Sequence, residues 1–153
     1  MNSDDVQIIK KTWEIPVSTP TDSGATILTT FFNRYPSNLE KFSFRDVPLA
    51  ELPTNSRFRA HASRIIRVFD ESIQALGQDG DLEKIGEIWT KVATNHIPRK
   101  ISKESYNQLK EVILEVLTAA CSLNESQAQS WAKLVDHVYV IIFKAINDDG
   151  DAI

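Results

Sequence analysis

Apolar residues recur at spacings of three, four and seven along almost the whole chain. Such spacing returns side chains to one face of an α-helix, and no long stretch alternates with the period of two that is typical of a strand. Prolines and a turn with two glycines at 77–81 divide the pattern into segments of unequal length. The sequence therefore predicts an all-α fold of about seven helices that cross at large angles, not a regular up-and-down bundle.

Local signals set the expected helix bounds. Ser3 is expected to cap a first helix that begins near Asp4, and Pro16 and Pro20 are expected to interrupt it. Residues 37–53 are expected to form short turns, and the tail after Asn147 is expected to fray. A second helix is expected after residues 21–23 and up to Pro36, a third from about 54 to 76, and a fourth from about 82 to Pro98. Two long helices are expected to follow Ser102 and Asn124, and Gln127 is expected to form a capping pair with Asn124.

Composition narrows the class of protein. The 153 residues, 42% of them hydrophobic, suffice for one domain with a sizeable core, and we expect a single domain over 1–153. A net charge of −4 without a dense Lys/Arg cluster argues against nucleic acid as a partner. No apolar run is long enough for a bilayer, and the start of the chain does not resemble a signal peptide, so we expect a cytoplasmic protein with no membrane partner.

The single cysteine, Cys121, excludes an intramolecular disulfide framework and a thiolate metal cluster. It is expected to be a small residue near a helix end rather than a redox centre, because no neighbouring basic residue in the sequence would lower its thiol pKa. An intermolecular disulfide under oxidation stays open.

Two histidines lie on the apolar faces of separate expected helices. Around His61, apolar residues recur at helical spacing from Phe58 to Leu76, and Ile85, Trp89 and Val92 lie eleven, seven and four positions before His96. A buried imidazole is unfavourable unless its nitrogens have partners. Two such imidazoles suggest a shared partner between them, which a planar apolar cofactor with a central metal would provide.

Three segments carry a family resemblance. Residues 24–42 contain Gly24, Leu28, Pro36 and Phe42 in the order of a glycine at a helix crossing, a pocket residue, a corner proline and a haem-contacting phenylalanine. Residues 58–69 resemble a distal helix with its histidine at His61, and residues 88–102 resemble a proximal helix with its histidine at His96. Trp13 matches a tryptophan that is often buried in the first helix. On these residues the chain resembles the globin family over its whole length, and within that family the small intracellular haemoglobins of flies.

The resemblance implies a globin fold of seven to eight helices around a pocket for haem b (iron protoporphyrin IX). His96 would be the proximal iron ligand, and its other nitrogen would donate to a carbonyl such as that of Val92. His61 would be the distal residue, which either donates a hydrogen bond to bound oxygen or itself ligates the iron. The resemblance to fly haemoglobins favours ligation by both histidines in the unliganded state, from which oxygen must displace His61.

Other positions follow from the same resemblance. Phe42 would pack on the porphyrin face, and Leu28 and Ile65 would shape the ligand pocket beside His61. Val92, Ile101 and Leu109 would line the proximal side and the inner edge. Arg64 is the first candidate to pair with a haem propionate, with Arg45 and Arg99 as weaker ones. His137 is expected to have no role toward the haem. The interval of 35 residues from His61 to His96 exceeds that of muscle globins, and the turn at 77–81 is expected to absorb the excess.

The function implied is reversible oxygen binding for storage or facilitated diffusion, not enzymatic turnover, with carbon monoxide and nitric oxide as further ligands and a monomer or weak homodimer as the assembly. An alternative is a nitric oxide dioxygenase or a scavenger of peroxide and other reactive oxygen species that depends on an external reductase. A haem-free helical sensor is a third hypothesis, which the presence of His96 disfavours. Two histidines without a third carboxylate or thiolate make a poor zinc or non-haem iron site.

Each residue taken alone also has an ordinary structural interpretation. His96 is typical of a helix C-terminus, where a cation interacts favourably with the helix dipole. His61 alone is most simply a core or boundary histidine, and Arg64 alone a solvated arginine. The order of the three segments taken together favours the haem interpretation.

Overall fold

The computed structural model describes the backbone of residues 1–151 and the side chains of residues 1–147. This part of the chain contains six α-helices, three short 3-10 helices and no strand, which confirms the all-α fold. In chain order the elements are α1 (Ser3–Ser18), α2 (Pro20–Arg34), η1 (Pro36–Lys41), η2 (Leu49–Thr54), α3 (Ser56–Ala75), α4 (Asp81–His96), η3 (Ile97–Arg99), α5 (Lys103–Ala120) and α6 (Glu125–Asp151).

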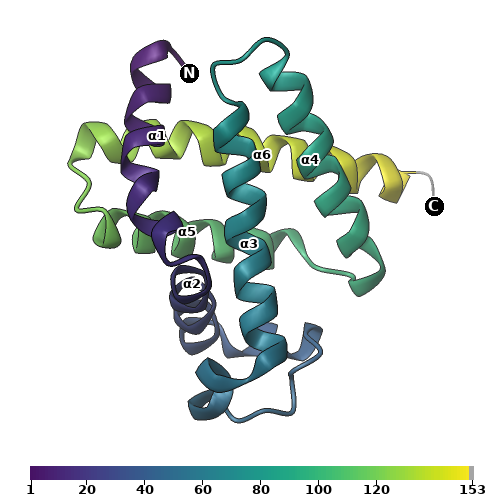
Figure 1. The fold of residues 1–153 in the computed structure, drawn as a ribbon. Coiled ribbons are helices and arrows are strands. Elements are labelled where there is room, and N and C mark those ends of the chain that lie inside the picture. The colour runs from purple at the N-terminus through teal and green to yellow at the C-terminus, as the bar shows by residue number, and fades with distance from the viewer. Residues whose placement is uncertain (152–153) are drawn as a thin grey trace.

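The helices cross one another instead of running alongside, as the unequal segment lengths predict. Figure 1 shows α3 passing in front of α5 and α6, with α2 viewed nearly along its axis. The most extensive contacts join α2 to α3 and α4 to α6. None of the described helices is both long enough and apolar enough to cross a bilayer.

The expected start of the first helix is wrong by one residue. Asn2, not Ser3, is the N-cap of α1, because its side chain accepts a hydrogen bond from the backbone N–H of Asp5 at 2.9 Å. The Asp5 carboxylate in turn accepts from the backbone N–H of Asn2 at 3.1 Å. This reciprocal capping box satisfies two N–H groups that the helix itself leaves unpaired.

The prolines near the first helix junction also act differently from the expectation. Pro16 lies inside α1 and does not end it. A proline deprives the carbonyl four residues earlier of its helical partner, and here the thiol of Cys121 lies 3.5 Å from that carbonyl, on Thr12. Pro20 does not interrupt a helix but begins α2, since a first-turn position requires no N–H donor.

The last two helices begin where the sequence predicts. Ser102 caps α5 by accepting from the backbone N–H of Ser105 at 3.0 Å. Asn124 and Gln127 form the predicted capping pair at the start of α6, with hydrogen bonds of 2.8 and 3.0 Å. Residues 148–151 continue α6 where the sequence predicts a frayed tail, since extending a formed helix costs far less than starting one, and fraying itself stays a prediction. Residues 152–153 of that tail lie outside the described residues.

A close crossing between α2 and α3 sets the position of α3. Gly24 faces the backbone of Ala62, and a Cβ atom at Gly24 would lie 2.1 Å from the Ala62 carbonyl oxygen. Only a glycine permits this approach. The crossing brings Leu28 of α2 and His61 of α3 to the wall of one cavity.

The segment between α2 and α3 is more ordered than the expected short turns. It contains η1 and η2, and Phe44 between them is 1% exposed. Phe44 stacks on Phe42 with ring centroids 5.2 Å apart, and the Arg57 guanidinium donates to the Ser43 carbonyl at 2.9 Å. These contacts join the segment to α3 and place Phe42 at the cavity.

Candidate functional site

A cavity of about 360 Å³ lies between α3 and α4. Residues of α2, α5, α6, η1 and η3, together with Phe42 and Ile101, complete its walls. Its volume lies within the range of small-molecule and cofactor sites. The nine residues that the sequence singles out for a cofactor or ligand pocket all line it: Leu28, Phe42, His61, Arg64, Ile65, Val92, His96, Ile101 and Leu109. Positions spread over more than 80 residues of sequence therefore converge on one cavity.

His96 is the last residue of α4, where its ring reaches back over the preceding turn. Its Nδ1 lies 2.7 Å from the Val92 carbonyl oxygen, the partner that the sequence suggests. A carbonyl only accepts, so Nδ1 carries the proton and Nε2 keeps its lone pair. Burial lowers the pKa of His96 against the opposing effect of this hydrogen bond, and the nearby Arg99 and Arg64 charges lower it further. The arrangement presents a neutral, oriented imidazole to the cavity.

His61 faces the same cavity from α3. Phe42 meets its ring edge-on at 5.1 Å between centroids, and Phe44 at 6.4 Å. Burial lowers the pKa of His61 to about 4, and the charge of Arg64 contributes next. His61 is therefore neutral at physiological pH. Its Nδ1 lies 3.5 Å from a guanidinium nitrogen of Arg64, which lies one turn further along α3.

The rim of the cavity is cationic. Lys41, Arg64 and Arg99 line it, and no aspartate or glutamate does so among the described residues. All three cations are exposed, and none of them forms an ion pair within the described part of the chain. Arg45, the other weaker candidate, is exposed but does not line the cavity. The rim thus suits an anionic group, while the walls suit an apolar one.

Sequence reasoning missed several residues of this cavity. Trp89 and Phe69 could have been found, because they lie seven residues before His96 and eight after His61 on the same helix faces. Lys41 and Asn38 of η1 and Tyr106 of α5 show no such local signal. The Tyr106 hydroxyl is buried without a hydrogen-bond partner among the described residues, and burial raises its pKa to about 12.

Two residues that the sequence set aside lie away from the cavity. His137 of α6 does not line it. Cys121 is the C-cap of α5, as expected of a small residue at a helix end, and burial raises the pKa of its thiol. A raised thiol pKa disfavours the reactive thiolate, in agreement with the structural interpretation.

Comparisons with known proteins find related sequences and structures. Residues 25–142 match the Globin family model. A hexa-coordinate haemoglobin of Drosophila melanogaster, solved in work on cyanide binding and haem cavity conformational transitions, is 81% identical, with 98% of each chain covered and a TM-score of 0.95. The haemoglobin of the botfly Gasterophilus intestinalis is 40% identical, with 96% of this chain and 99% of that chain covered and a TM-score of 0.88. Globin CTT-Z of Chironomus thummi piger is 26% identical over 147 residues, which cover 95% of this chain and 88% of its own length.

Proposed function

Because the chain belongs to the globin family, we propose that it binds haem in the cavity between α3 and α4 and thereby binds dioxygen reversibly. The observation that carries the proposal is the hydrogen bond from His96 Nδ1 to the Val92 carbonyl, which leaves Nε2 available as a metal ligand on the cavity wall. Haem iron, when bound, would supply the coordination site at which small diatomic gases bind. The same position would admit carbon monoxide and nitric oxide.

The residues present fit this cofactor. Leu28, Ile65, Val92 and Leu109 offer apolar surface to the porphyrin, with Phe42 beside them. Three cations at the rim, those of Lys41, Arg64 and Arg99, match the negative charge of the propionates. Cys121 does not line the cavity, so no thioether bond to the chain is available. We therefore propose haem b, held without a covalent bond, which extraction into acidified organic solvent would verify.

His61 has two roles that depend on which ring nitrogen carries the proton. When Arg64 donates to Nδ1, the proton of the neutral ring lies on Nε2, which then donates a hydrogen bond to bound oxygen. Ligation of the iron by Nε2 requires the other tautomer, in which Nδ1–H faces the guanidinium. The contact with Arg64 therefore favours the oxygen-stabilising role, and its loss favours ligation by His61.

We further propose that, when no gas is bound, Arg64 releases Nδ1 and His61 ligates the iron. The 81% identical Drosophila protein is described as hexa-coordinate, and His61 here is neutral and lines the same cavity as His96. An external ligand must then displace His61, which lowers the observed affinity by the fraction of molecules in the open state.

Visible spectra of the dithionite-reduced protein under nitrogen test both proposals. We expect a Soret band and sharp, split visible bands that shift on addition of carbon monoxide. His61→Leu should replace the split bands by a single broad band, because the iron loses its second protein ligand. His137→Leu is the matched control, since His137 does not line the cavity, and its spectrum should equal that of the parent.

The outcomes separate the two proposals. Absence of a Soret band after addition of haem would show that the cavity does not hold haem and would refute the function. A Soret band with a broad visible band in the parent would keep haem binding and refute ligation by His61. If His61→Leu left split bands in place, another residue would be the second ligand.

A further inference from the structure

A short segment at the mouth of the cavity gathers positive charge around one serine. Ser102 follows Arg99 and Lys100 and precedes Lys103, and all four residues are exposed. None of these three cations forms an ion pair within the described part of the chain. Arg99 and Ile101 also line the cavity. The segment therefore places an exposed hydroxyl group next to the cationic rim.

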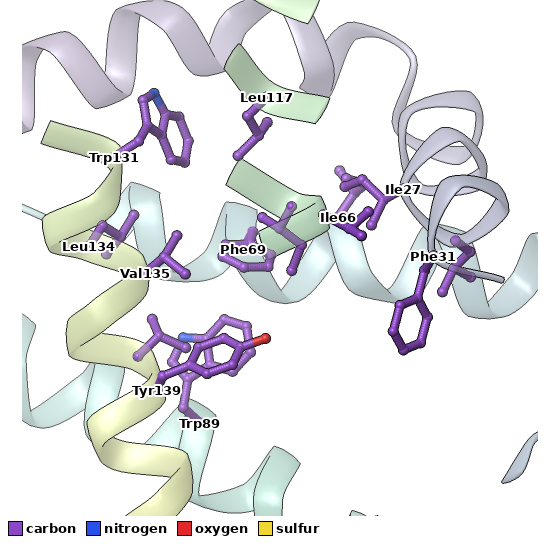
Figure 2. Close-up of a cluster of buried hydrophobic side chains, with 14 of the residues drawn as sticks. Ile27, Phe31, Ile66, Phe69, Trp89, Leu117, Trp131, Leu134, Val135 and Tyr139 are labelled. Atoms are coloured by element: carbon purple, nitrogen blue, oxygen red, sulfur yellow. The ribbon is translucent and has the colours of Figure 1, made fainter. Parts of the chain in front are cut away.

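Two cations shortly before a hydroxyl are rare in this chain. Among all its serines and threonines, only Thr12 and Ser102 have two cations within the three residues that precede them. The Thr12 hydroxyl is engaged, because it donates to the Ile8 carbonyl at 2.7 Å and accepts from the Trp131 indole at 2.8 Å. Figure 2 shows Trp131 in a buried cluster, so the Thr12 hydroxyl faces the core. Of the two, Ser102 is the one whose hydroxyl a second protein can reach.

The backbone at Ser102 suits a protein that binds an extended peptide. Ser102 has φ −75° and ψ 156°, which is extended backbone, and it lies between η3 and α5. Its hydroxyl accepts from the Ser105 backbone N–H and donates to the Ser105 hydroxyl, both at 3.0 Å. Both hydrogen bonds are exposed, so water can satisfy Ser105 when another protein engages the Ser102 hydroxyl.

We propose that Ser102 is a phosphorylation site for a serine kinase whose substrate groove is acidic. Such a groove selects its substrates by charge, and Arg99 and Lys100 supply the matching cations before the serine. In the reaction, Ser102 Oγ forms a bond to the γ-phosphorus of Mg-ATP while the bond from that phosphorus to the β–γ bridging oxygen breaks. ADP leaves with that oxygen, and the hydroxyl proton passes to the catalytic aspartate of the kinase.

The added phosphate would lie where the fold already favours an anion. It brings a charge of about −1.5 to −2 to the first turn of α5, where the helix dipole and the free N–H groups attract negative charge. Arg99 and Lys103 lie on either side of Ser102 in the chain. A guanidinium binds phosphate through two parallel hydrogen bonds, so Arg99 is the expected partner of the phosphate.

This pairing would change how the cavity holds its cofactor, and this effect, unlike the modification itself, rests on the proposed haem binding. Arg99 is one of three cations at the rim that match the charge of the propionates. A phosphate on Ser102 competes with a propionate for Arg99 and offsets most of the positive charge at the rim. Phosphorylation would therefore speed the loss of haem, by about two- to fivefold for one exposed ion pair.

Treatment of the haem-loaded protein with Mg-ATP and the catalytic subunit of cyclic-AMP-dependent protein kinase, which selects cations before its serine, tests the site. We expect phosphate on Ser102, assigned by peptide mass spectrometry, and Ser102→Ala should remove it. Lys100→Gln keeps the hydroxyl, and residue 100 does not line the cavity, so it should slow phosphate incorporation by about tenfold without affecting haem content. Lys103→Gln is the matched control, because Lys103 follows the serine, and its rate should equal that of the parent.

Transfer of haem to an excess of an apoprotein that binds haem more tightly measures the effect on the cavity. The phosphorylated protein should lose haem faster than the parent, and added salt should reduce the difference because it screens exposed charges. Ser102→Asp and Ser102→Asn form a matched pair that needs no kinase, since both side chains cap a helix and only the aspartate adds charge. Ser102→Asp should lose haem faster than Ser102→Asn.

The measurements separate the possible failures. Absence of phosphate from Ser102, or equal rates of incorporation in the parent and Lys100→Gln, would overturn the assignment of the site. Phosphate on Ser102 with unchanged haem loss, together with equal haem loss from Ser102→Asp and Ser102→Asn, would overturn the effect on the cavity. Absence of a Soret band before treatment would contradict the proposed function, while mass spectrometry would still decide whether Ser102 is modified.

Discussion

Gly24→Ala is expected to destabilise the protein because it forces apart the helix crossing that positions His61. The new Cβ atom would lie 2.1 Å from the Ala62 carbonyl oxygen, 2.6 Å from the carbonyl carbon and 3.0 Å from Cα. All three are backbone atoms, so no side-chain rotation relieves the clash. The oxygen reaches ordinary contact only at 3.4 Å, which requires α2 and α3 to separate by about 1.3 Å along that direction.

The net cost follows from two opposing effects. Overpacking of this kind costs about 3 kcal/mol when the backbone must move. Alanine within a helix recovers about 1 kcal/mol relative to glycine. The expected loss in the free energy of unfolding is therefore about 2 kcal/mol, which corresponds to a fall in Tm of about 4–8 °C for a chain of this length.

Denaturant and thermal unfolding of the two proteins measure this difference, and Gly86→Ala is the matched control. Gly86 lies inside α4, and a Cβ atom there would have nothing within 4 Å. Its replacement should raise the free energy of unfolding by about 0.5–1 kcal/mol. In the reduced, haem-loaded protein, Gly24→Ala should also lower the fraction with split visible bands, because Ala62 is the residue after His61.

A Gly24→Ala variant as stable as the parent would refute this reasoning, since it would show that the crossing accommodates a methyl group. Equal changes in the free energy of unfolding for Gly24→Ala and Gly86→Ala would also refute it. The predicted difference between the two variants comes from the backbone that neighbours Gly24 and not from helix propensity.

Three further predictions concern stability. The Ser130 hydroxyl, the Asn2 N–H and Lys133 lower the pKa of Asp5 from its ordinary value of 3.8 to about 2. This carboxylate therefore stabilises the fold above about pH 4, and the stabilisation is lost as the pH falls through 2. The Tm difference between the parent and Asp5→Asn should shrink over that range, and a difference independent of pH would contradict this. Ser72→Ala leaves the buried Trp89 indole N–H without its acceptor and should cost about 1–3 kcal/mol in denaturant titrations, whereas an unchanged midpoint would show that another acceptor takes its place. Phe44→Ala should cost about 3–5 kcal/mol by the same assay, and a loss below about 1 kcal/mol would show that the segment closes over the vacated space.

Local features of the fold and of the site follow from the sequence because they depend on helical spacing. The periodicity places His61 and His96 on apolar faces, and the Val92 carbonyl lies one turn before His96 wherever the helix forms. The hydrogen bond between them is present at 2.7 Å. The capping of α5 by Ser102 and of α6 by Asn124 also joins residues that lie within one helical turn of each other.

Features that join distant segments could not be predicted in this way. Lys41 and Tyr106 lie at the cavity because η1 and α5 pack beside the histidine helices, and nothing in their neighbourhoods in the chain marks them. The sequence predicts that Pro16 interrupts a helix, but Pro16 lies inside α1. Cys121, over 100 residues away in the chain, lies within reach of the Thr12 carbonyl that Pro16 leaves without its helical partner. Contacts of this kind depend on which helix surfaces pack against each other in the folded protein.

The sequence by itself determined the helical class, the two histidines that face a core and the hydrogen bond that orients His96, because each is a relation between residues within one or two helical turns. The tertiary structure alone decided that both histidines line one cavity, that its rim carries three cations and that Trp13 meets Asp70. These relations arise from close packing between elements, since the distance between two side chains on different helices depends on every contact that sets how the helices cross.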